Sequence, residues 1–216
     1  MMKLSKALTL AMASALLVAT GAARASELTV TLQDITQAGS YGGAAAGFYT
    51  LQVTDNSNSV TQTILAMCDD FNTHISIGST WQANLFDKSQ IDGNITKEGD
   101  TIKFPPPSPK YNQAGYLFAQ ALAGTQAQQV DINAAIWNLM DGLTGPPLVG
   151  GALTYYNDAV ANGGGFDYTN VMRVITSHTP EVAQEFLVGI VPVPAAVWLF
   201  GSALGLLAGV RRSQRA

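Results

Sequence analysis

Cysteine is almost absent from this chain, since Cys68 is the only one in 216 residues. A single cysteine cannot form an internal disulfide, so the sequence excludes a small scaffold held together by disulfide bonds. We expect Cys68 to be a buried free thiol packed among Ile64, Leu65 and Met67, because an unpaired cysteine behaves as a small apolar side chain. An intermolecular disulfide and a chemically special cysteine are the alternatives.

Histidine is also scarce, and the two present, His74 and His178, are far apart in the sequence. Neither belongs to a recognisable metal-binding or catalytic-triad motif. We therefore expect no catalytic residues, no cofactor and no metal centre. A secreted hydrolase is an alternative function, and it would require one of these histidines beside a carboxylate or a serine such as Ser76 or Ser79.

The adjacent acidic residues Asp69 and Asp70 raise the question of a calcium site. Successive side chains of a strand point to opposite faces, so two neighbouring carboxylates in a strand would not share one ion. We expect instead an acidic pair at the end of a loop that bonds nearby backbone groups.

Basic residues are few, with 11 Lys and Arg against 15 Asp and Glu. Six of the 11 lie in the two terminal segments, which leaves five between residues 26 and 192 and a net charge there near −10. This charge argues against nucleic acid or an anionic membrane surface as a binding partner, since phosphate binding depends on Lys and Arg. It fits a protein outside the cell, either bridged to acidic polysaccharide by divalent cations or simply kept soluble by its charge.

The N-terminal segment has the pattern of a secretory signal peptide over residues 1–25. Lys3 and Lys6 precede the apolar run LTLAMASALLVAT, and Ala23 and Ala25 supply the small side chains that a signal peptidase reads. We expect cleavage after Ala25 and export of the remaining chain.

The C-terminal segment has an apolar run over residues 194–210, followed at once by Arg211 and Arg212. Seventeen helical residues span roughly 25 Å, close to the lower limit for crossing a bilayer. Basic residues stay on the cytoplasmic side, so we expect a type I inner-membrane precursor with its globular part outside.

This segment resembles the PEP-CTERM sorting signal in its VPxPA variant. The matching residues are Val191, Pro192, Val193, Pro194, Ala195, Ala196, Trp198, Leu199, Phe200, Gly201 and Ser202. The Pro-Glu-Pro motif that gives the family its name has a glutamate between its prolines, and Val193 replaces it here. This replacement would change which exosortase subtype acts on the chain. The resemblance implies a Gram-negative, exopolysaccharide-making bacterium whose exosortase removes the helix. The mature protein would then go to the cell surface or extracellular matrix, with a structural or adhesive role there.

Between these ends we expect one exported α+β domain over residues 26–190. Its first part, 26–103, is β-rich: residues 27–35, 47–53, 60–68 and 74–86 alternate apolar and polar side chains, which is typical of strands in an antiparallel sheet or sandwich. Prolines in the segment 104–110 indicate a stiff connector.

After the prolines the pattern changes to a helical period. Residues 111–162 predict two or three helices as a small helical subdomain, with Gly124 and Gly142 placed to end the first two. Residues 181–190 predict a strand that returns to the sheet.

Three segments within residues 64–141 resemble a group of PEP-CTERM surface proteins and, through them, the thioester domains of Gram-positive adhesins. The segments are MCDDFNTHISIGSTWQANLF, YNQAGYLFAQAL and INAAIWNLM. The resemblance implies an internal thioester between a strand cysteine and a glutamine before Ala-Ile-Trp, and hence a covalent adhesin as a second alternative function.

The candidate thioester pair in this chain is Cys68 with Asn133, because Asn133 occupies the place of the glutamine. Its side chain is one methylene shorter, about 1.5 Å along the chain. Gln129 lies one helical turn earlier, and its use would shift the site by that turn. We expect Cys68 to remain an ordinary buried thiol.

Overall fold

The computed structural model describes residues 26–35, 38–93, 109–179 and 182–190. The expected signal peptide with Ala23 and Ala25, most of the proline-rich segment and the whole sorting signal, including its apolar run 194–210, lie outside these residues. Among the helices that the structure describes, none is long and apolar enough to cross a membrane.

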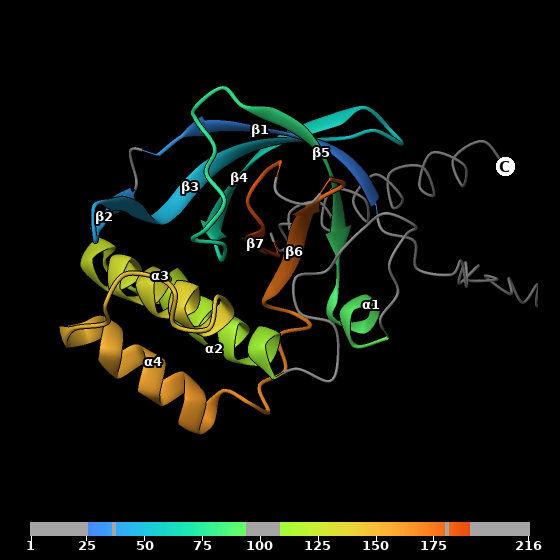
Figure 1. Cartoon of the computed structure of the whole chain (residues 1–216). Coiled ribbons are helices and arrows are strands. Elements are labelled where there is room, and N and C mark those ends of the chain that lie inside the picture. Colours follow the sequence, from blue (N-terminus) through green and yellow to red (C-terminus); the bar gives the residue numbers. More distant parts are fainter. Residues whose placement is uncertain (1–25, 36–37, 94–108, 180–181, 191–216) are drawn as a thin grey trace, which may run out of the picture.

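Six antiparallel strands close into a barrel (Figure 1). They are β1 (Ser26–Asp34), β3 (Ala44–Asp55), β4 (Val60–Cys68), β5 (Thr80–Phe86), β6 (Met172–Ser177) and β7 (Phe186–Gly189). Around the barrel the order is β1-β5-β6-β7-β4-β3, and β3 pairs back with β1. The expected α+β class with an antiparallel sheet is confirmed, but the sandwich is wrong, because β1 forms hydrogen bonds along both of its edges and closes the sheet into a barrel.

The barrel interior is filled by alternate residues of every strand. These residues are Leu28, Val30, Leu32, Tyr49, Leu51, Val53, Ala66, Cys68, Trp81, Ala83, Ile175, Phe186 and Val188. This is the alternation that a strand with one face in a core requires. Of the three neighbours expected for Cys68, Ile64 packs against the same cluster. Met67 points to the opposite face and Leu65 is exposed, so these two are wrong.

Three helices cover one side of the barrel (Figure 1). They are α2 (Lys110–Ala123), α3 (Gln126–Met140) and α4 (Gly150–Asn162), and α3 contacts β3 on one side and α4 on the other. Outward residues of the strands, including Phe48, Met67 and Leu187, belong to one apolar cluster with α2 and α3. The strands beneath the helices are consequently buried on both faces.

Local signals explain where the helices begin and end. Thr125 starts α3 with a capping box, in which Gln128 Oε1 accepts the Thr125 N–H at 2.8 Å. Gly124 lies directly between α2 and α3, as the sequence predicted.

Some elements differ from the sequence-based expectation. The strand expected over residues 74–86 begins only at Thr80, because Gly78 turns the chain with a φ of +87° and its N–H bonds to the Leu32 carbonyl at 2.8 Å. The returning strand is limited to Phe186–Gly189. Three elements were missed: β6, the short strand β2 (Ala38–Tyr41) and the one-turn helix α1 (Lys88–Asp92).

Candidate functional site

Cys68 is the last residue of β4, and its side chain is completely buried at one end of the barrel interior. Its thiol donates a hydrogen bond to the Asp70 carbonyl at 3.0 Å, and its sulfur accepts one from the Asp70 N–H at 3.3 Å. Both contacts are local, since they come from the chain that turns away immediately after the strand. The structure thus confirms that Cys68 is buried, and Cys68 forms no disulfide within the described residues.

The environment of Cys68 disfavours its thiolate. Burial raises the pKa of the thiol well above its ordinary value, and the charge of Asp69 raises it further. The backbone N–H of Asp70 and the indole of Trp137 act in the opposite direction, but they are the weaker influences. The thiol is therefore protonated at neutral pH, which makes it a poor nucleophile.

Asn133 of α3 meets Cys68 across 65 residues of sequence, and its side chain is also completely buried. Its Nδ2 donates to the Cys68 backbone carbonyl at 2.6 Å, and its Oδ1 accepts from the Gly47 N–H at 2.8 Å. The amide therefore joins α3 to both β3 and β4. Cys68 and Asn133, the candidate thioester pair, are therefore in contact. The hydrogen bond of Asn133 is made to the backbone carbonyl of Cys68 and not to its thiol.

Gln129, the alternative amide, is held elsewhere. Its Nε2 donates to the carbonyls of Ala121 at 3.2 Å and Gly124 at 3.0 Å, at the C-terminal end of α2. This glutamine fixes the connection between two helices.

The loop after Cys68 is tied to the end of α3. Asp70 Oδ1 accepts from the N–H groups of Asn72 at 3.1 Å and Thr73 at 3.2 Å. The Phe71 N–H donates to Asp141 Oδ2 at 2.8 Å, and the Phe71 ring packs on Trp137 with 5.2 Å between centroids. The expectation that the acidic pair bonds nearby backbone is correct for Asp70.

A cavity of about 670 Å³ opens beside this loop, at the end of the barrel where Cys68 lies. Its lining residues are Leu32, Ile35, Gly43, Ala44, Ala45, Tyr49, Phe71, His74, Ile75, Ser76, Ile77, Trp137 and Gln184. Tyr49 lines the cavity and lies near Cys68: its hydroxyl donates to the Ala45 carbonyl at 2.5 Å, and its pKa is raised first by burial and then by the nearby Cys68. Volumes of this size are typical of small-molecule sites.

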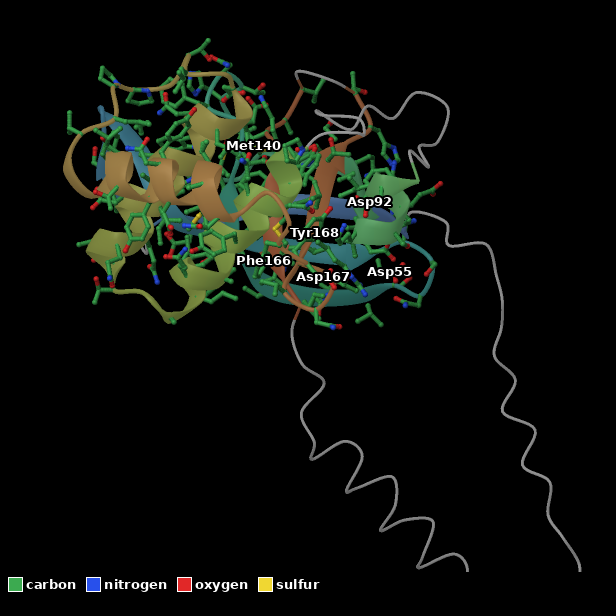
Figure 2. All side chains as sticks on the ribbon, turned by 90° about the horizontal axis from the view of Figure 1, so that it is seen from below. Asp55, Asp92, Met140, Phe166, Asp167 and Tyr168 are labelled. Carbon is green, nitrogen blue, oxygen red and sulfur yellow. The ribbon has the colours of Figure 1, made fainter. Side chains whose placement is uncertain are left out.

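A second group of titratable side chains surrounds Tyr168, on the side of the molecule where Asp92 of α1 lies (Figure 2). Burial raises the Tyr168 pKa, and the negative charges of Asp92 and Asp87 add to this effect. Lys88 lies over the ring, 5.3 Å from its centroid, and forms an ion pair with Asp92. These contacts join α1 to the segment between α4 and β6.

The two histidines lie in different places. His74 is exposed at the rim of the cavity, whereas His178 follows β6 and bonds through its backbone N–H to the Gln82 carbonyl at 3.0 Å. Within the described part of the chain, neither ring forms a hydrogen bond with a serine or a carboxylate. No group of three or more metal-ligating side chains occurs among those same residues.

Three residues of this site carried no signal in the sequence: Gly47, Tyr49 and Gln184. Their roles depend on contacts between distant segments, such as the bond from Gln184 Nε2 to the Asp70 carbonyl at 3.1 Å. Comparison of the chain with protein-family models, with curated proteins and with solved structures found no match.

Proposed function

We propose that this chain is an exported protein of the cell surface or extracellular matrix, sorted by an exosortase through residues 191–216. Its domain has a structural or adhesive role in an exopolysaccharide layer and is not an enzyme. Support comes from the apolar N-terminal segment ending at Ala25, the VPVPAAVWLFGS motif with its following arginines, and the excess of acidic residues. Signal peptidase, exosortase and the inner membrane are its partners during processing.

The observation that favours a non-covalent role is the use of Asn133. Both ends of its amide bond backbone groups, Gly47 N–H and Cys68 C=O, so the side chain stabilises the junction of barrel and helices. The thiol beside it is protonated and hydrogen-bonded. Because the Asn133 amide and the Cys68 thiol are both engaged in hydrogen bonds to the backbone, they favour a structural role for this site and not a reactive one.

A covalent adhesin is a second candidate, favoured by the meeting of Cys68 and Asn133 in a buried site beside Trp137. In that reaction the thiolate attacks the Asn133 side-chain carbonyl carbon, ammonia leaves, and a thioester forms. An amine of the partner then displaces the thiol and forms an amide bond. The asparagine would first have to give up both of its backbone hydrogen bonds.

Sorting is tested by following the full chain in a bacterium that has an exosortase and in a strain that lacks it. We expect the wild-type chain to reach the surface or matrix fraction without its C-terminal segment. The Pro192→Ala, Pro194→Ala variant should retain that segment in the membrane fraction. The matched control is Pro105→Ala, Pro106→Ala, which changes two prolines outside the motif. A distribution independent of the exosortase would contradict the proposal.

The covalent alternative is decided by the intact mass of the exported protein purified without reductant. The full calculated mass, together with one titratable thiol after unfolding, would support the non-covalent role. A mass lower by one ammonia, raised by methylamine and restored to the calculated value in Cys68→Ala, would make the protein a covalent adhesin.

A further inference from the structure

The cavity at the Cys68 end of the barrel has walls from segments that are distant in sequence. Ala44 and Ala45 come from the start of β3, Phe71 and residues 74–77 from the loop after β4, and Trp137 from α3. Hydrogen bonds within these segments and between them fix the walls, including Phe71 N–H to Asp141 and Gln184 Nε2 to Asp70. The cavity is thus built by the tertiary structure and needs no rearrangement to exist.

The lining of the cavity has no Asp, Glu, Lys or Arg, although the described domain is strongly acidic elsewhere. Four rings line it instead, those of Tyr49, Phe71, His74 and Trp137. An ionic ligand would lose its hydration there without gaining an opposite charge. The cavity therefore suits an uncharged ligand with apolar surfaces.

One nearly buried polar group in the lining calls for a hydrogen-bonding partner. Gln184 is 8% exposed, and its one hydrogen bond in the described part of the chain uses Nε2, which leaves its side-chain carbonyl oxygen to accept. The indole N–H of Trp137 is directed instead at the Cys68 sulfur, so Trp137 offers the cavity its ring. A purely apolar ligand, such as an acyl chain, would leave the Gln184 oxygen unpaired, which costs free energy.

We propose that this cavity binds one uncharged sugar residue. A pyranose ring has apolar C–H faces that stack on aromatic rings and hydroxyl groups that donate hydrogen bonds, which matches the four rings and the carbonyl oxygen of Gln184. The proposal rests on the matrix role proposed above and deepens it, because it names the part of an exopolysaccharide that the domain holds. Single sugar residues bind proteins weakly, so we expect affinities in the millimolar range.

The test is a titration of the full chain labelled with ¹⁵N-tryptophan, followed by NMR. Each indole N–H signal is assigned by replacing Trp81, Trp137 or Trp198 with phenylalanine. The probes are glucose, galactose, mannose, rhamnose and N-acetylglucosamine, with glucuronate as a charged probe and hexanol as an apolar one. We expect at least one neutral sugar to shift the Trp137 signal saturably and to leave the Trp81 signal unchanged.

Two variants with matched controls locate the binding. Ala44→Leu fills the cavity and should weaken the affinity at least tenfold, whereas the same change at the exposed Ala123 should not. Ile77→Ser alters the rim and should weaken it about threefold, corresponding to one lost apolar contact. Ile77 is 58% exposed, and the control Val60→Ser changes a residue that is 56% exposed and outside the cavity.

The proposal is overturned if no neutral sugar shifts the Trp137 signal, if only glucuronate or hexanol does so, or if both cavity variants bind as tightly as their controls. These results are independent of the sorting experiment. A chain that binds sugar but is not processed by an exosortase would keep this inference and refute the proposed function, and a sorted chain that binds no sugar would do the reverse.

Discussion

Asn133 in α3 and Asn84 in β5 are both completely buried, but the two regions around them use the amide in opposite ways. Asn133 bonds one backbone group of β3 and one of β4. Asn84 lies opposite Thr176 of β6, and neither atom of its amide has a hydrogen-bond partner among the described residues. Burial of the same side chain therefore stabilises one junction and costs free energy at the other.

The two asparagines differ because the backbone groups around them differ in whether they still need a hydrogen-bond partner. At Asn133 the barrel meets a helix, and the polar backbone of the strand ends is satisfied by a side chain from outside the sheet. At Asn84 the backbone of β5 is already paired on both sides, to β1 and β6, so no backbone N–H or C=O remains there to bond the amide.

The largest effect is expected for Asn133→Leu, which keeps the branching of the side-chain heavy atoms and removes the amide. Gly47 N–H and Cys68 C=O would each lose a buried partner, at about 1–3 kcal/mol each, so the free energy of unfolding should fall by about 2–6 kcal/mol. Chemical denaturation of the full chain measures this. A loss below about 1 kcal/mol would mean that the junction does not depend on Asn133.

Gly47→Ala tests the strand side of the same junction. Gly47 has a φ of +114°, a conformation that side-chain-bearing residues rarely adopt, and this conformation presents its N–H to Asn133. We expect a loss of about 1–3 kcal/mol in unfolding free energy. Gly165→Ala is the control, since Gly165 has no positive φ and open space around it. Equal effects of the two substitutions would contradict the role of Gly47.

The buried thiol at the junction makes stability depend on pH. The pKa of Cys68 is raised in the folded state, so the folded protein holds the proton more tightly than the unfolded chain. This contribution is complete below about pH 8.5, where an unfolded cysteine titrates, and is lost as the pH rises.

Between about pH 8.5 and pH 10 we therefore expect unfolding free energy to fall by up to about 1.4 kcal/mol per pH unit, and Cys68→Ala to remove this slope. Above about pH 10 the buried tyrosines with raised pKa values, Tyr49 and Tyr168, add their own loss in both proteins. An identical pH profile for the wild type and Cys68→Ala would refute this assignment.

The smallest effect is expected for Asn84→Leu, the same substitution as at Asn133. An amide without partners is replaced by an apolar side chain with the same branching of heavy atoms, so stability should stay within about 1 kcal/mol of wild type. Chemical denaturation of Asn84→Leu and Asn133→Leu side by side measures the difference between the two buried amides directly. A loss at Asn84 as large as that at Asn133 would abolish it.

Much of the secondary structure could be predicted from the sequence, because strands and helices with one buried face repeat at different periods. Helix α2 buries Tyr111, Ala114, Leu117, Phe118 and Ala121 at helical spacing, and β4 has the bounds 60–68 that its pattern predicted. Strand β6 was missed for a physical reason: Val174 packs on the helix side and Ile175 in the barrel interior, so a strand buried on both faces shows no alternation.

The candidate site was predictable only in part. The motif resemblance brought Cys68 and Asn133 together as a pair, and they are in contact. It did not indicate that the contact joins the amide to a backbone carbonyl, or that a cavity with Tyr49 and Gln184 lies beside it.

By itself, the sequence of this protein determined most of its local elements, the change from strands to helices after the prolines, and the strong acidity between its terminal motifs. These properties depend on neighbouring residues and on composition. Only the tertiary structure decided that β1 closes the barrel by pairing with both β3 and β5, that one buried asparagine is bonded and another is not, and where a cavity remains. Those outcomes depend on contacts between residues distant in the chain, whose geometry no local pattern encodes.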